Sequence, residues 1–191
     1  MTDWTIVLWS AARQIAEEAK LPRDIWPEDE MPPQVFFQSL REKEDPIPAL
    51  SYMATALPKL EAIEWALHAL PEPEQDDPDY AQRMLLRDAA FRWVGEPDEE
   101  NRQAMYKLTE TSDSAWPETL VGLAIFFSGG TIGPDEVAPI TVDPSVCGTV
   151  ISGAMQTAVA ANIKTKPELA SQALDLAEKV ATHGREALAK T

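Results

Sequence analysis

Apolar residues recur at intervals of three and four positions along most of the chain. One such series runs from Leu60 to Leu70, and another runs from Leu169 to Val180. This spacing places the apolar side chains on one face of an α-helix. The strict alternation of apolar and polar residues that is typical of half-buried strands is scarce. The pattern therefore predicts a mostly helical protein.

Prolines divide the chain into helical segments. The chain contains 16 prolines, and several stand where an apolar series begins, as at Pro58, Pro117 and Pro144. Proline is tolerated in the first turn of a helix, where its missing N–H has no helical partner. Glycines such as Gly95 mark helix ends. Together these signals predict helices near residues 4–20, 33–43, 47–56, 58–70, 78–94, 97–111, 117–128, 144–163 and 167–189.

Length and composition suit one hydrophobic core. The chain has 191 residues, of which 45% are hydrophobic. Only residues 131–142 (TIGPDEVAPITV) have extended character, and their glycine and prolines favour a loop. We predict an all-α fold: a single all-helical domain over residues 1–191, with a loop or extended segment at about 129–143. About eight or nine helices would pack as antiparallel pairs. A solenoid-like stack is an alternative, although no repeat motif supports it.

The chain is acidic, with a formal charge of −16, and residues 72–113 hold 12 acids and 5 bases. This charge argues against nucleic acid and anionic membranes as partners and permits a protein partner with a basic surface. Solubility alone is the simplest explanation of the charge. No apolar run approaches the roughly 20 residues that span a bilayer, and the start does not resemble a signal peptide. We therefore expect a soluble, cytoplasmic protein.

No arrangement of reactive side chains meets the requirements of a familiar site. One Cys and two His are too few for a zinc site, and Glu64 with His68 lacks di-iron motif spacing. Cys147 lies among small residues and is expected as a buried packing thiol. The acidic run 72–79 lacks calcium-loop spacing, and the glycines at 129–130 lack the lysine of a phosphate-binding loop. The sequence predicts no catalytic residue, cofactor or metal.

Six tryptophans offer either core volume or contact points for a partner. Trp65 and Trp93 lie inside periodic helices, which favours the core. Trp26 lies in a proline-bounded segment, where it either staples that loop to the core or anchors a partner, and the staple is favoured. The weak candidates for partner binding are Trp26, Phe36, Phe37, Asp76, Asp77 and Asp79.

Three stretches carry a resemblance to a known family: residues 21–40 (LPRDIWPEDEMPPQVFFQSL), 56–70 (ALPKLEAIEWALHAL) and 115–134 (AWPETLVGLAIFFSGGTIGP). They resemble an uncharacterised proteobacterial family of small helical proteins whose domain has no known function. Its members are sometimes annotated near type VI secretion genes. The resemblance implies a helical fold, a link to type VI secretion and no established catalytic residues. The acidic segment 72–79 departs from the family pattern, so its role is not implied.

Three functions remain open from the sequence. The first is a non-enzymatic interaction module, an adaptor or chaperone-like accessory for a secretion apparatus or its cargo. The second is an acidic inhibitor, such as an immunity protein or a nucleic-acid mimic, that binds a basic enzyme through its central acidic band. The third is an enzyme with an unrecognised carboxylate pair. A purely structural subunit completes the set. The missing chemistry, the charge and the resemblance favour the first, and the oligomeric state is not predicted.

Overall fold

Helices make up the secondary structure of a computed structural model that describes residues 3–130 and 141–189. No strand occurs in these two ranges. The helices are α1 (Ala12–Glu18), α2 (Pro33–Arg41), α3 (Ile47–Ala56), α4 (Lys59–Ala69), α5 (Tyr80–Gly95), α6 (Glu99–Thr109), α7 (Pro117–Phe127), α8 (Ser145–Asn162) and α9 (Leu169–His183), with short 3-10 turns η1 (Arg23–Ile25) and η2 (Gly184–Ala187). The all-α prediction is confirmed.

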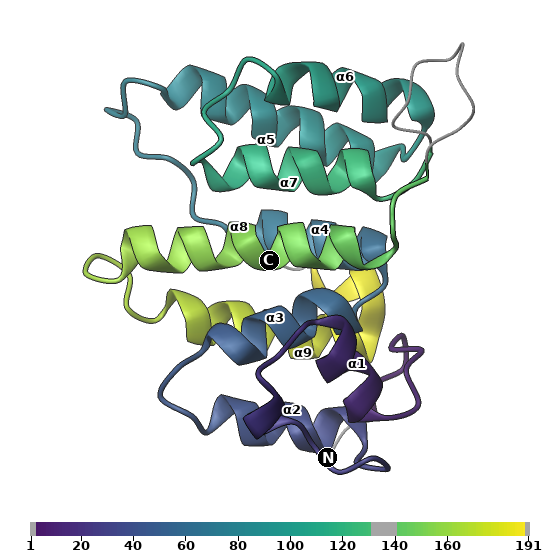
Figure 1. The fold of residues 1–191 in the computed structure, drawn as a ribbon. Coiled ribbons are helices and arrows are strands. Elements are labelled where there is room, and N and C mark those ends of the chain that lie inside the picture. Colours follow the sequence, from purple (N-terminus) through teal and green to yellow (C-terminus); the bar gives the residue numbers. More distant parts are fainter. Residues whose placement is uncertain (1–2, 131–140, 190–191) are drawn as a thin grey trace.

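The helices lie in tiers, with α5, α6 and α7 side by side at one end and α1 and α2 at the other (Figure 1). Between these ends, α8 packs against α7 on one side and against α3 on the other. Helix α9 packs against α4, although roughly 100 residues separate them in the chain. A strict solenoid has contacts only between chain neighbours, so this packing differs from the solenoid alternative.

One continuous hydrophobic core joins side chains from α1 to beyond η2. Trp65 lies at its centre, fully buried, and its indole N–H donates to the backbone carbonyl of Ala173 at 2.8 Å. Trp93 is also buried. Both tryptophans are core residues, as their helical spacing predicts. Within the described parts of the chain, no helix is long and apolar enough to cross a membrane.

Prolines stand at or just before the helix starts. Pro117 is the first residue of α7, and Pro58 and Pro144 directly precede α4 and α8. Gly184 follows α9 with a φ of 62°, a left-handed conformation that glycine adopts without steric cost. This residue ends α9 at His183, so the predicted continuous helix over 167–189 is too long. The predicted segment at 129–143 lies mostly outside the described residues, which omit 131–140.

The predicted first helix, 4–20, is wrong over its first half, because only Ala12–Glu18 is helical. Residues 3–11, here called the N-terminal strap, run without helical structure. The N–H groups of Thr5 and Ile6 donate to the carbonyl of Ala181 at 2.9 and 3.3 Å, and the Thr5 hydroxyl donates to that of Thr182 at 2.6 Å. These bonds satisfy carbonyls at the end of α9, so tertiary contacts replace helical ones.

Candidate binding cavity

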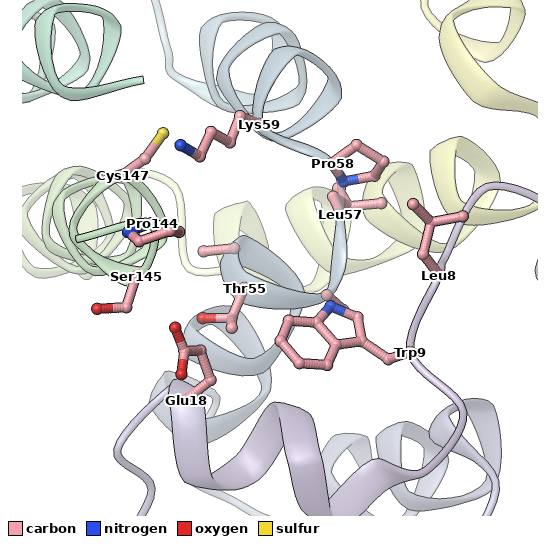
Figure 2. A pocket seen from close by; sticks show the side chains of 13 residues that line it. Leu8, Trp9, Glu18, Thr55, Leu57, Pro58, Lys59, Pro144, Ser145 and Cys147 are labelled. Carbon is pink, nitrogen blue, oxygen red and sulfur yellow. The ribbon is translucent and has the colours of Figure 1, made fainter. Parts of the chain in front are cut away.

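A cavity of about 260 Å³ opens between the N-terminal strap, the α3–α4 junction and the start of α8 (Figure 2). Leu8 and Trp9 of the strap form one side, and the chain from Ala54 to Lys59 forms another. The first turn of α8 and the end of α1 complete the wall. Most of this lining is apolar, so water inside it has few hydrogen-bonding partners. We call it the apolar cavity.

The junction of α3 and α4 forms because proline constrains the residue before it. Leu57 precedes Pro58 and adopts an extended conformation, with φ −72° and ψ 144°, which ends α3. The chain then turns into α4 at Lys59. This sharp break places the last turn of α3 and the first residue of α4 on the same wall of the apolar cavity.

The wall formed by α8 depends on a close helix contact. A Cβ atom on Gly148 would lie 3.0 Å from the carbonyl oxygen of Ala54 and 3.3 Å from the Cα atom of Thr55. Glycine therefore lets the backbones of α3 and α8 approach closely. The carboxylate of Asp143 accepts the N–H of Ser145 at 2.9 Å, which satisfies a backbone donor at the start of α8.

The strap covers one edge of the apolar cavity only in part. Trp9 is half-buried against the core. The neighbouring Leu8 is 89% exposed, the largest exposed fraction among the big apolar side chains that the structure describes as exposed. An exposed leucine at the mouth of an apolar cavity forms the kind of exposed apolar surface that favours contact with another molecule.

Cys147 and Lys59 are two titratable groups that line the cavity. Cys147 is buried, and burial raises the pKa of its thiol to about 11, so little thiolate forms at neutral pH. The ammonium of Lys59 donates to the carbonyl of Ser128 at 2.9 Å, beyond the end of α7. Among the described residues, no group of three His, Cys, Asp or Glu side chains is placed to hold a metal ion. The expected packing role of Cys147 agrees with this burial.

A second hollow, of about 200 Å³, lies at the other end of α8, against the acidic segment 71–77. We call it the polar hollow. Arg83 donates two hydrogen bonds to the carboxylate of Glu118, at 3.1 and 3.2 Å, and one to Asp77 at 2.7 Å. The side chain of Glu118 is only 1% exposed. A buried carboxylate is stable there because the guanidinium matches its charge.

The predicted acidic residues differ in their surroundings. Asp77 accepts the N–H of Asp79, and this bond together with Arg83 holds its pKa below the usual range. Asp76 and Asp79 are exposed on the same turn. The structure therefore brings Asp77 into a structural ion network and leaves its two neighbours in solvent.

The three aromatic residues that were weak candidates for partner binding all pack against other parts of the protein. Trp26 is half-buried, its indole N–H donates to the carbonyl of Leu21 at 2.7 Å, and the guanidinium of Arg13 lies 4.5 Å from its ring. These contacts attach the loop to the rest of the protein, which is the structural alternative that the sequence favours for Trp26. Phe36 and Phe37 are 4% and 0% exposed and belong to the core. Neither ring is accessible to a partner while α2 keeps its place.

Sequence reasoning found neither the apolar cavity nor the ion pair between Arg83 and the buried Glu118. Leu8 and Trp9 lie in a segment predicted as helix, and Glu118 follows a proline at a helix start, where an acid is common. The one local signal was the close run of Trp4, Ile6, Val7 and Trp9, too apolar for an exposed terminus. Nothing local identifies the partners of these residues, which come from distant parts of the chain.

Comparison with known proteins places this fold in a family. The model of a family of unknown function (DUF6931) matches residues 36–181. The chain belongs to this family. The match includes α3, α4 and α8, which form the inner walls of the apolar cavity, whereas the strap and α1 precede it. No curated protein and no solved structure matches the chain.

Proposed function

We propose that this DUF6931 protein is a non-catalytic interaction module, an adaptor or chaperone-like accessory that holds an apolar side chain of a protein partner in the apolar cavity. The observation that carries the proposal is an apolar cavity with an exposed leucine, Leu8, at its mouth. Burial of one aliphatic side chain contributes about 1.5–3 kcal/mol. A partner from a type VI secretion apparatus or its cargo stays a prediction of the family resemblance.

The net charge of −16 supports a basic partner surface. Complementary charge steers encounter and raises the association rate, while the apolar contact sets the lifetime of the complex. Association should therefore become slower as ionic strength rises, because salt screens charges more than a Debye length apart. The dissociation rate should change much less.

A photo-crosslinking amino acid at position 8 tests the proposal in the native host. The matched control carries it at position 85, because Leu85 is also an exposed leucine, 52% accessible, but lies on α5 away from the cavity. We expect one protein crosslinked from position 8 only, identified by mass spectrometry and then purified. Its affinity should fall about tenfold with Leu8→Asp, as expected for an apolar contact residue, and stay unchanged with Leu85→Asp. Equal effects of the two substitutions would contradict the proposal.

An acidic inhibitor of a basic enzyme is the second candidate, and one observation favours it. The ion pair of Asp77 and Arg83 holds the acidic turn in place, while the side chains of Asp76 and Asp79 stay exposed. A fixed turn with free carboxylates suits recognition of a basic surface. The double variant Asp76→Lys, Asp79→Lys leaves the network intact. Under this candidate it should abolish binding to the partner, whereas under the cavity proposal Leu8→Asp should have the larger effect.

A further inference from the structure

One charged group on the wall of the apolar cavity lacks a partner. Glu18 is the last residue of α1 and is half-buried, and its carboxylate makes no hydrogen bond or ion pair with any described residue. Figure 2 shows its side chain reaching toward Thr55 and Ser145. The neighbouring Glu17 is paired, because its carboxylate accepts a bond from Arg13 at 2.8 Å. A partly desolvated carboxylate without a partner favours a cation beside it.

The cationic group of the wall, Lys59, already has a hydrogen-bond partner. The ammonium of Lys59 donates to the carbonyl of Ser128. The pKa of Asp143 lies below its usual range because of hydrogen bonds from Ser145 and, less strongly, the positive charges of Lys20 and Lys59. Lys59 therefore has a hydrogen-bond partner outside the cavity, although it forms no ion pair with a described carboxylate. The charged group of the lining whose side chain has no described hydrogen-bond partner is Glu18.

We infer that the apolar cavity accepts an aliphatic side chain that stands next to a positive charge. The docking segment of a protein partner would pair a leucine- or methionine-like residue with a lysine or arginine, whose cation would reach Glu18. This inference rests on the proposed function and specifies the partner's chemistry. The volume of about 260 Å³ suits one side chain, since pockets for drug-sized ligands have volumes of roughly 300–1,000 Å³.

Three small probes that share one branched alkyl chain test the inference on the whole protein: 3-methylbutan-1-amine, 3-methylbutan-1-ol and 4-methylpentanoate. The readout is the indole N–H resonance of Trp9, which lines the cavity, in an ¹⁵N-labelled sample. The resonance of Trp9 is assigned among those of the six tryptophans because it is absent from the spectrum of Trp9→Phe. The buried Trp93 is an internal reference. We expect the amine to bind about threefold to fivefold more tightly than the alcohol, as for a partly exposed ion pair, and the carboxylate to bind least.

Glu18→Gln should reduce the preference for the amine to about one while leaving alcohol binding unchanged. Glu17→Gln is the matched control, because it removes the same charge from the same helix outside the cavity lining and should keep the preference. Equal binding of amine and alcohol by the wild-type protein overturns the inference, and so does tightest binding of the carboxylate. No saturable shift of Trp9 with any probe also overturns it.

The two proposals fail in different ways. If no protein is crosslinked from position 8 while the amine still binds with a dependence on Glu18, the proposed function is wrong and the ligand chemistry stands. If a partner is crosslinked but Glu18→Gln leaves its affinity unchanged and the amine shows no preference, the proposed function stands and the inferred cation is wrong.

Discussion

The apolar cavity and the polar hollow lie at opposite ends of α8 and are built from opposite chemistry. At the start of α8, Cys147 and Gly148 face an apolar space, and Glu18 is the charged group of the lining without a described hydrogen-bond partner. At its end, Ala158 and Asn162 border a hollow in which Arg83 matches two carboxylates. Matched charges stabilise a structure, whereas an apolar cavity beside a charge without a partner suits a ligand. The comparison therefore supports a structural role for the hollow and agrees with the binding role that we propose for the cavity.

The largest expected effect concerns the buried carboxylate of the polar hollow. Glu118→Ala leaves Arg83 with only Asp77 as its carboxylate partner, and loss of one partner of a buried pair costs about 3–5 kcal/mol. Urea unfolding measures this change in the free energy of unfolding. Asp29→Ala is the control, because Asp29 is 83% exposed in its pair with Arg13 and should contribute about 1 kcal/mol at most. If Glu118→Ala lowers the free energy of unfolding by less than about 1 kcal/mol, the hollow does not have this structural role.

The next effect concerns the thiol in the cavity wall. Burial raises the pKa of Cys147 from 9.0 to about 11, which lowers its thiolate fraction at pH 8 about 100-fold. Iodoacetamide should therefore modify the folded protein at least about 100-fold more slowly than the protein unfolded in urea at the same pH. A difference below about tenfold would mean that the cavity presents a reactive nucleophile, and its assignment as a non-catalytic site would fail.

A smaller effect separates two glycines of α8. A Cβ atom on Gly153 meets nothing within 4 Å, so Gly153→Ala should stabilise the helix by about 0.5–1 kcal/mol. A Cβ atom on Gly148 would meet the backbone of α3 at 3.0 Å, so Gly148→Ala should lose that gain. Thermal unfolding of the two variants gives the comparison. Equal stabilisation would show that α3 and α8 are not in tight contact beneath the cavity.

The smallest effect is the pH dependence of the acidic turn. The folded pKa of Asp77 is depressed from 3.8, first by the hydrogen bond from the N–H of Asp79 and then by Arg83. Its contribution to stability is therefore present above the unfolded pKa and is lost as pH falls through the lower, folded pKa. The stability difference between wild type and Asp77→Asn should be constant at neutral pH and shrink below pH 3.8. A difference that grows on acidification would contradict this network.

Local signals predicted most of the helices correctly. The starts of α4, α7 and α8 follow from Pro58, Pro117 and Pro144, and the burial of Trp65 follows from the periodicity of its helix. These features depend on residues within one or two helical turns. The prediction of helix 4–20 was wrong over its first half. There, N–H and hydroxyl groups of the strap donate to carbonyls of α9, which lie about 175 residues away in the chain.

The sequence by itself determined an acidic, helical protein that is poor in Cys and His. Its helical spacing, prolines and scarcity of Cys and His act locally or through composition, so they can be read without a structure. Only the tertiary structure decided which groups come together: Leu8 and the start of α8 line one cavity, and Arg83 bonds to Glu118. Contacts between distant segments depend on the packing of whole helices. No local pattern therefore reveals that Glu18 lines the cavity with a carboxylate that has no described partner.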